Sequence, residues 1–104
     1  MSESTAASFV LRVVEGPDTG RSHPITTGDH VVGRARDCSF VLADPAASRK
    51  HFRLMCRGET LEVMDMGTSY GTFVNSARIS RGRIQIADRL QIGDSVFVID
   101  AGGV

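Results

Sequence analysis

Residues 52–66 of this 104-residue chain read FRLMCRGETLEVMDM and contain two short runs in which apolar side chains alternate with others. The apolar members of the alternation are Phe52, Leu54 and Cys56, followed by Leu61 and Val63. Alternation with a period of two places one set of side chains on each face of a β-strand. The dipeptide Arg57-Gly58 between the runs is a turn signal. This stretch therefore predicts two strands separated by a turn, each with one buried face.

Similar short runs recur along the rest of the chain. They lie at residues 9–13, 31–32, 40–42, 73–74, 84–86, 90–92 and 96–99. Turn signals such as Gly16-Pro17-Asp18 and Gly93-Asp94 separate them, and no window repeats apolar residues with the period of a helix. About ten short strands with turns at intervals of roughly 8–12 residues are typical of an all-β sandwich or barrel. The sequence therefore predicts an antiparallel all-β fold.

The length and composition are typical of one small globular domain. Apolar residues make up 41% of the chain, which is sufficient for a single core. We expect the folded domain to span residues 9–100, with a disordered N-terminal tail at 1–8 and a C-terminal tail at 101–104. The sequence leaves open whether the chain is a fragment of a larger protein, and it leaves the oligomeric state open.

Charged side chains balance over the whole chain but not locally. Twelve basic and twelve acidic residues cancel, so no general attraction to nucleic acid is expected. Between Gly33 and Arg57, six basic residues stand against Asp37 and Asp44, a local balance of 6 − 2 = +4. This segment is where we expect an anionic ligand to bind.

The sequence carries no pattern for a metal, a disulfide framework or a membrane span. Cys38 and Cys56 are too few for a structural zinc site, so we expect both to be reduced and buried. No apolar stretch approaches the roughly 20 residues of a membrane span, and the N-terminus lacks a signal-peptide pattern. These features predict a soluble cytoplasmic domain without metal or cofactor and without membrane insertion.

Four predicted turn segments carry side chains that are suited to binding a phosphate group. They are Gly33-Arg34, Ser48-Arg49-Lys50-His51, the loop from Gly67 to Thr72, and Asn75. The guanidinium of Arg34 is a rigid fork of donors that matches two phosphate oxygens. Glycines let backbone N–H groups approach a ligand closely. The loop lacks the Lys and the following helix of a nucleotide P-loop, so ATP binding is not expected.

Each of these side chains also has a structural interpretation. Arg34 alone could be a solvated side chain at a strand end, and Ser48 could cap a turn. The Ser48-x-x-His51 spacing suggests a nucleophile and its base, as in a small hydrolase, but no nucleophile elbow surrounds Ser48. We therefore expect His51 to hydrogen-bond a neighbouring loop and fix its shape, and we expect no enzymatic activity.

The order and spacing of these segments resemble the forkhead-associated (FHA) domain family. Thirteen residues separate Gly33-Arg34 from the Ser48-x-x-His51 segment, and thirteen more separate His51 from Asp65. From there the chain reads Asp65-x-Gly-x-Ser-x-Gly-Thr-x-x-Asn75, and the late segment Leu90–Asp94 is similar to the family's penultimate turn. The resemblance covers residues 9–100. It implies an eleven-stranded β-sandwich of two antiparallel sheets, with loops at one end that bind phosphothreonine in a partner protein.

The resemblance also implies a role for each matching residue. Arg34 and Ser48 would hold the phosphate oxygens, Arg49 would add positive charge, and Ser69 would donate its hydroxyl. A small pocket between the loops that carry Ser48 and Gly67 would accept the threonine methyl group. The residues that would support the site without touching the ligand are Gly33, His51 and Asn75, with Gly71 and Thr72 completing the turn.

Tyr70 departs from the family pattern, which usually has Asn at that position to grip the peptide backbone. A tyrosine lacks the paired donor and acceptor of an amide, so Tyr70 would stack on the peptide, offer its hydroxyl or partly cover the site. The leading hypothesis is a phosphothreonine-binding module whose partner is a threonine-phosphorylated protein, such as a Ser/Thr kinase or its substrate. The alternative is an FHA-fold scaffold that binds an unphosphorylated partner or itself.

Overall fold

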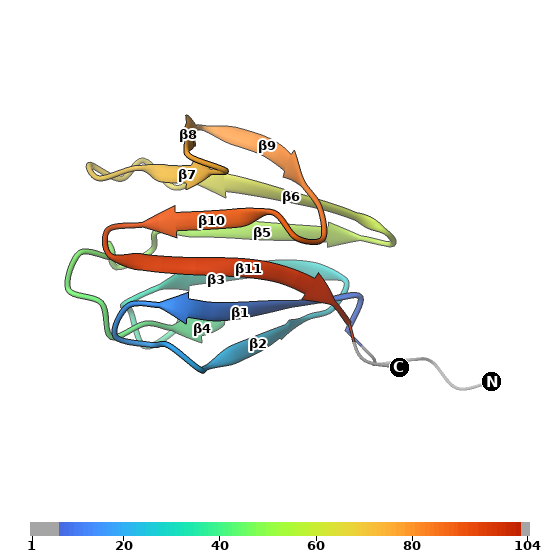
Figure 1. Ribbon diagram of the computed structural model, residues 1–104, viewed down its shortest axis with the longest axis horizontal. Coiled ribbons are helices and arrows are strands. Elements are labelled where there is room, and N and C mark those ends of the chain that lie inside the picture. The colour runs from blue at the N-terminus through green and yellow to red at the C-terminus, as the bar shows by residue number, and fades with distance from the viewer. Residues whose placement is uncertain (1–6, 103–104) are drawn as a thin grey trace.

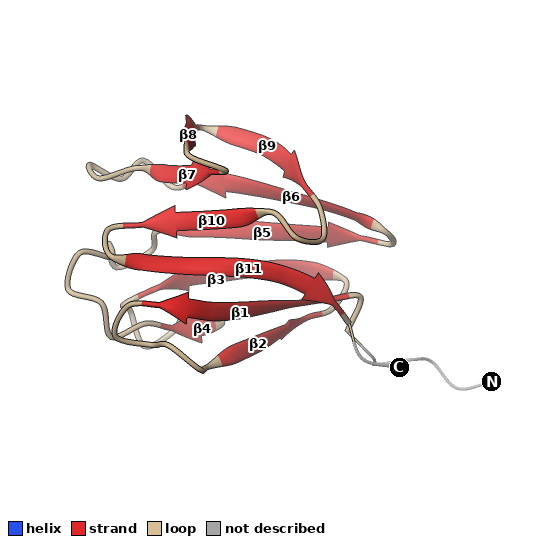
Figure 2. Ribbon diagram, viewed as in Figure 1, coloured by secondary structure: helices blue, strands red, loops and turns tan. Residues whose placement is uncertain are grey.

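The computed structural model describes residues 7–102 and consists of strands and loops, with no helix in that range (Figure 2). The strands are β1 (Phe9–Glu15), β2 (Ser22–Ile25), β3 (Gly28–Gly33), β4 (Phe40–Val41), β5 (Phe52–Arg57), β6 (Thr60–Asp65), β7 (Thr72–Val74), β8 (Ala77–Ile79), β9 (Arg81–Ile84), β10 (Arg89–Ile92) and β11 (Ser95–Ala101). None of the described residues forms a helix that could cross a membrane.

The strands form two sheets that pack face to face (Figure 1). One sheet has six strands in the order β2-β1-β11-β10-β7-β8, and the other has five in the order β4-β3-β5-β6-β9. Sequential hairpins pair antiparallel, and the β3–β4 pairing is parallel. The predicted eleven-stranded sandwich is confirmed, and the barrel alternative is wrong because the two sheets remain separate. Among the described residues, the parallel β3–β4 pair is the one exception to the antiparallel prediction.

The core forms between the two sheets from the alternating residues of their inner faces. In β5, Phe52, Leu54 and Cys56 are buried, as the alternation predicted. The ring of Phe52 meets that of Phe97 in β11, on the opposite sheet, edge to face at 5.7 Å between centroids. Burial of each large side chain contributes about 1.5–3 kcal/mol to folding. The contact between Phe52 and Phe97 thus helps to hold the two sheets together.

Both cysteines are buried and free, in agreement with the prediction. Cys56 belongs to the core, and Cys38 lies in the β3–β4 loop, where its thiol donates to the backbone carbonyl of Arg49 at 3.2 Å. Burial raises the pKa of the Cys38 thiol. Since the thiolate is the reactive form of cysteine, this environment keeps Cys38 a packing residue.

The sequence did not predict strands β2 and β8, and it did not predict where β9 ends. In β2 only Ile25 is buried, so a polar edge strand shows no alternation, and β8 has no fully buried residue. The predicted run at 84–86 is wrong in its second half, because β9 ends at Ile84 and Ile86 is 51% exposed. The reason is a local turn: the Asp88 carboxylate accepts from the Gln85 N–H at 2.9 Å, and the Asp88 N–H donates back to the Gln85 carbonyl.

The predicted N-terminal tail falls largely on residues 1–6, which lie outside the described residues. Within the described part, the Ser8 N–H donates to the Ile25 carbonyl at 3.0 Å, and the Ser8 carbonyl accepts from Gly102 at 3.1 Å. Strand β11 extends to Ala101, one residue past the expected boundary. The limits of the domain therefore stay a prediction.

Candidate functional site

Three loops at one end of the sandwich carry nearly all of the predicted site residues. They are the β3–β4 loop with Arg34, the β4–β5 loop with Ser48 and Arg49, and the β6–β7 loop with Ser69 and Tyr70. All three lie at the left-hand end in Figure 1. Strand pairing ends where these segments leave the sheets, so the exposed side chains of Arg34, Arg49 and Ser69 can face a ligand.

Arg34 is fastened to the neighbouring loop by its backbone and by one side-chain nitrogen. Its N–H donates to the Ser48 carbonyl at 3.0 Å, and its Nε donates to the Ala47 carbonyl at 2.5 Å. The two terminal Nη atoms have no hydrogen-bond partner among residues 7–102, and the side chain is exposed. A fork with two free nitrogens on a fixed stem suits bidentate binding of a phosphate.

Gly33 allows the β3–β4 and β4–β5 loops to approach each other. A Cβ atom at this position would lie 2.3 Å from the backbone oxygen of Arg49 and 2.9 Å from the Lys50 Cα. These neighbours are backbone atoms, which a side-chain rotation cannot move. The close approach of the chain therefore requires glycine here, and it places Arg34 directly beside Ser48.

His51 joins the β4–β5 loop to the β6–β7 loop. Its ring is fully buried. Its Nδ1 accepts from the Ser48 N–H at 3.0 Å, so this nitrogen carries no proton, and its Nε2 therefore donates to the Gly71 carbonyl at 2.9 Å. Both ring nitrogens are thus engaged with backbone groups, and Nδ1 contacts the N–H of Ser48, not its hydroxyl. The geometry of a Ser48–His51 nucleophile and base is absent.

The β6–β7 loop is organised around the carboxylate of Asp65, at the end of β6. One oxygen accepts from the backbone N–H groups of Gly67 and Thr68 at 3.0 and 2.9 Å. The other accepts from the hydroxyls of Thr68 and Thr72, both at 2.7 Å, and the Thr68 hydroxyl accepts from the Gly71 N–H. Thr72, the first residue of β7, is buried, and its hydrogen bond to Asp65 supports the turn.

Asp65 makes the loop sensitive to acid. Burial opposes ionisation of its carboxyl, but the hydrogen bonds from Thr68, Thr72 and Gly67 outweigh burial, so its pKa lies below the ordinary value. A carboxyl whose pKa is lower in the folded state stabilises the fold at neutral pH. That contribution is lost as the pH falls from the unfolded value, about 3.9, through the folded pKa.

We therefore expect Asp65→Asn to lower the free energy of unfolding by about 1–3 kcal/mol at pH 7, because it places an amide NH2 against hydrogen-bond donors. Urea unfolding of both proteins between pH 7 and pH 2.5 measures this difference. The gap between wild type and variant should narrow as the pH falls below about 4, because the Asp65 carboxyl gains its proton first in the unfolded chain. A gap that stays constant across this range would show that the charge of Asp65 does not stabilise the loop.

Ser69 and Tyr70 occupy the tip of the β6–β7 loop and are exposed, Tyr70 by 62%. Gly71 behind them has a φ of 87°, and a Cβ there would lie 2.6 Å from Arg78 Nε. Arg78 also makes a long 3.4 Å contact from Nη2 to the Ser69 carbonyl. Arg78 was not identified from the sequence. Only the pairing of β7 with β8, which sets Phe73 opposite Arg78, places it beside this loop.

Asn75 is not brought into this cluster. It lies three residues beyond Thr72, about 10 Å along β7, in a turn where Asn75 and Ser76 both have positive φ, 49° and 76°. Its side-chain oxygen accepts from the Arg89 N–H at 3.0 Å, and its Nδ2 donates to Asp88 at 3.1 Å. Asn75 thus ties the β7–β8 turn to the start of β10. Asn75 can therefore support the binding loops only through strand β7, which connects it to the β6–β7 loop.

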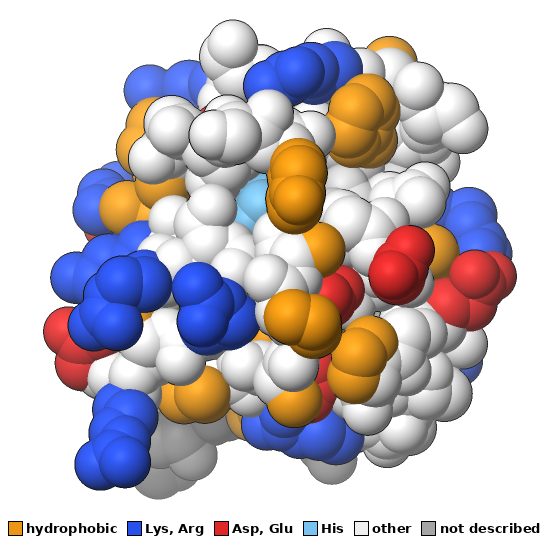
Figure 3. All heavy atoms as spheres, turned by 90° about the vertical axis from the view of Figure 1, so that its left-hand side faces the viewer, with side chains coloured by type: hydrophobic (Ala, Val, Ile, Leu, Met, Phe, Trp, Pro, Cys, Tyr) orange, Lys and Arg blue, Asp and Glu red, His pale blue; other side chains and the backbone are white. Residues whose placement is uncertain are grey.

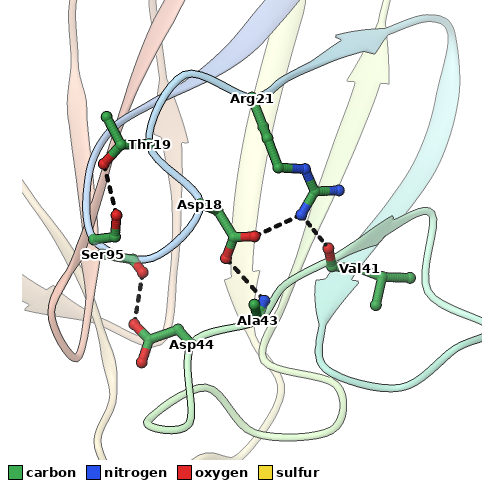
Figure 4. Close-up of polar contacts among 8 residues, drawn as sticks. Asp18, Thr19, Arg21, Val41, Ala43, Asp44 and Ser95 are labelled. Atoms are coloured by element: carbon green, nitrogen blue, oxygen red, sulfur yellow. Dashed lines mark hydrogen bonds and ion pairs between the residues drawn. The ribbon is translucent and has the colours of Figure 1, made fainter.

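Two buried carboxylates brace the loop that carries Ser48 (Figure 4). Asp18 accepts from Arg21 at 2.6 Å and from the Ala43 N–H at 2.8 Å. Asp44 accepts from the Ser95 hydroxyl at 2.6 Å and from the Ala46 N–H at 2.8 Å. Asp44 and its partner Ser95 are 51 residues apart, so this contact was not foreseeable from local sequence pattern.

The charge of this end is uneven, as the local count predicted. Figure 3, which faces the loops, shows several Lys and Arg side chains on the left of this end, others at its edges, and apolar side chains mainly near the centre. Arg34, Arg36 and Arg49 are exposed, whereas Lys50 lies 3.7 Å from the Asp37 carboxylate. The three arginines have no carboxylate within ion-pair distance among residues 7–102. An anion would meet a positive surface here.

Known proteins resemble this chain over most of its length. The family model described as the cytoplasmic domain of the inner membrane component of T3SS matches residues 12–102. The FHA domain-containing proteins FhaA and FhaB of Mycobacterium tuberculosis are 27% identical over 96 residues and 35% identical over 92 residues. These alignments cover 92% and 88% of this chain, but only 18% and 59% of the two relatives.

A solved structure agrees with the sequence relatives. It comes from a structural and functional analysis of phosphothreonine-dependent FHA domain interactions, and it superposes with a TM-score of 0.85 at 26% identity. The match covers 94% of this chain and 100% of that chain. The sandwich fold of this chain, its sequence relatives and the superposition together show that the chain belongs to the FHA domain family.

Proposed function

We propose that this chain is a non-catalytic module that binds phosphothreonine in a partner protein. The observation that carries the proposal is the placement of Arg34, whose free Nη atoms stand beside Ser48 on a stem fixed by the Ala47 carbonyl. Arg clusters recognise phosphorylated motifs in several families of signalling domains, FHA domains among them. In this arrangement Arg34 and Ser48 bind the phosphate oxygens, Arg49 adds charge, and Ser69 donates from the facing loop.

The supporting residues explain how such a site stays in shape without a ligand. Gly33 sets the spacing between two loops, His51 bridges Ser48 and Gly71, and Asp65 with Thr72 holds the third loop. A site whose loops are already ordered loses less entropy when a peptide binds. Because both nitrogens of His51 are occupied by backbone groups, we assign this residue to structure and not to catalysis.

The expected affinity is modest. Hydrogen bonds to a charged group contribute about 1.5–3 kcal/mol each, and three or four of them give about 5–12 kcal/mol before the cost of association. A net value of about −8 kcal/mol corresponds to a micromolar dissociation constant. The phosphate supplies most of this energy, so phosphorylation would act as a switch for the interaction.

We infer that the partner is a threonine-phosphorylated protein, such as a Ser/Thr kinase or its substrate. We infer a cytoplasmic location, because two free, buried cysteines suit a reducing compartment. The net charge of zero supports a protein partner over a nucleic acid.

Titration of matched peptides tests the proposal. An oriented library with a central phosphothreonine identifies a binder, which is then compared with its phosphoserine and unphosphorylated forms by calorimetry. We expect micromolar binding of the phosphothreonine peptide, weaker binding of the phosphoserine peptide, and no measurable binding without phosphate. Equal affinity for all three peptides would contradict the proposal.

The exposed ring of Tyr70 favours one alternative, a scaffold that binds an unphosphorylated partner or a second copy of itself. Tyrosine is enriched at protein interfaces, because its ring is apolar and its hydroxyl can form a hydrogen bond. A pull-down from the native host with and without phosphatase separates the two functions. A complex that survives phosphatase and is lost in Tyr70→Ala supports the scaffold.

A further inference from the structure

A cavity of about 440 Å³ extends from the proposed phosphate site toward the β3–β4 loop. Its lining residues are Arg34, Ala35, Arg36, Asp37 and Arg49. Arg34 and Arg49 also belong to the proposed phosphate site, whereas Ser48 and Ser69 do not line the cavity, so the cavity adjoins that site. Its volume lies within the range of known ligand pockets, roughly 300–1000 Å³.

The charge of the cavity exceeds what one phosphate neutralises. Its one acidic lining residue, Asp37, faces the Lys50 ammonium at 3.7 Å. A phosphothreonine carries about −1.5 to −2 charges at neutral pH, which Arg34 and Arg49 together balance. The charge of Arg36 then remains, and this exposed side chain has no hydrogen bond or ion pair within residues 7–102.

The backbone beneath the cavity is rigidly placed. The Ala35 N–H donates to the Arg49 carbonyl at 2.9 Å, and the Cys38 N–H donates to the Ala35 carbonyl at 3.1 Å. The buried Cys38 thiol donates to the same Arg49 carbonyl, and Ala35 itself is buried. These contacts hold the backbone on both sides of Arg36 against the β4–β5 loop, so the exposed Arg36 side chain extends from an ordered part of the β3–β4 loop.

We propose that this cavity is a second anion subsite, in which Arg36 binds a negatively charged side chain of the same peptide that carries the phosphothreonine. The inference rests on the proposed phosphothreonine binding and adds a selectivity to it. The shared ligand chemistry is an anionic side chain, either a carboxylate or a second phosphate. Partners with an acidic or doubly phosphorylated segment are then preferred over singly phosphorylated neutral ones.

A positional scan tests the subsite. The probes are nonapeptides of Ala, Gly and Ser with a central phosphothreonine, in which one Glu is moved through every flanking position. We expect one or two adjacent positions at which Glu raises the affinity by about three- to tenfold, as for an exposed ion pair. Replacing that Glu by phosphoserine distinguishes the two sources, with a further gain where a second phosphate is the better ligand. The gain should shrink as the salt is raised from about 0.05 to 0.5 M, because exposed charges are screened.

Two variants test whether Arg36 is the residue that binds the acidic side chain. Arg36→Gln should abolish the gain from Glu while changing the affinity for the all-neutral phosphothreonine peptide by about twofold or less. Arg57→Gln removes the same charge at the far end of β5 and should keep the gain in full. The subsite is overturned if no position shows a gain, or if the gain persists in Arg36→Gln. A neutral phosphothreonine peptide that binds no better than its unphosphorylated form instead contradicts the proposed function, and the subsite fails with it.

Discussion

Arg34→Ala is expected to weaken binding of a phosphothreonine peptide by roughly 100-fold. The substitution removes two charge-assisted hydrogen bonds from the phosphate, a loss of about 3 kcal/mol, and each 1.4 kcal/mol is a factor of ten in affinity. The fold should survive, because the variant loses only one side-chain hydrogen bond, from Nε to the Ala47 carbonyl. Calorimetric titration with the best library peptide gives the affinity, and urea unfolding gives the stability.

Two further variants make this result specific. Arg34→Lys keeps the charge but loses the planar fork, so it should recover only part of the affinity. Arg83→Ala removes an exposed arginine of β9 that has no ion pair within residues 7–102, and it should bind like the wild type. If Arg34→Ala and Arg83→Ala weaken binding equally, the effect is general electrostatics and Arg34 is not a phosphate ligand.

His51→Leu is expected to lower the free energy of unfolding by about 2–6 kcal/mol. Leucine fills a similar volume, so the loss comes from two backbone groups, the Ser48 N–H and the Gly71 carbonyl, that are left without their partner. Each buried unsatisfied group costs about 1–3 kcal/mol. The variant should also bind phosphopeptide more weakly, because the two loops are no longer tied together. Urea unfolding and calorimetry measure the two effects.

His23→Leu provides the matched control for this substitution. His23 is half-buried in β2. Its ring bonds the side chain of His30 at 2.9 Å and stacks on Phe40 of β4, and among the described residues it makes no hydrogen bond to the three binding loops. His23→Leu should cost less stability, because one buried group, the ring nitrogen of His30, loses its partner where His51→Leu leaves two, and it should leave the peptide affinity within about twofold. A His51→Leu protein as stable as the His23→Leu protein would show that the bridge contributes nothing.

The strands that alternate could be predicted from local sequence, because one face of each is buried. The burial pattern of β5 and β6 follows the apolar positions of residues 52–63. The edge strands β2 and β8 bury little and were missed, since polar residues on an edge carry no periodic signal. The alternation of Ile84 and Ile86 predicted a strand that is too long. The strand ends at Ile84, because a turn closed by Asp88 follows it.

The chemistry of the site was visible in the turn segments, but its assembly was not. Arg34, Ser48 and the loop after Asp65 were expected to meet, and the structure joins their loops through Gly33 and His51. Asn75 was expected to support these loops without touching the ligand, and it lies at the other end of β7, in the β7–β8 turn. Arg78 and the Asp44–Ser95 contact were not foreseen, because strand pairing and sheet packing bring together residues far apart in sequence.

The sequence by itself determined the strand pattern of the buried segments, the reduced state of the cysteines and the kinds of side chain available to an anion. These properties depend on residue type and short spacing, which the chain carries locally. Only the tertiary structure decided which turns share one end of the sandwich, and that His51 serves two loops while Arg36 borders a cavity beside Arg34. Those outcomes depend on the order of strands in two sheets, and that order is set by packing between distant segments.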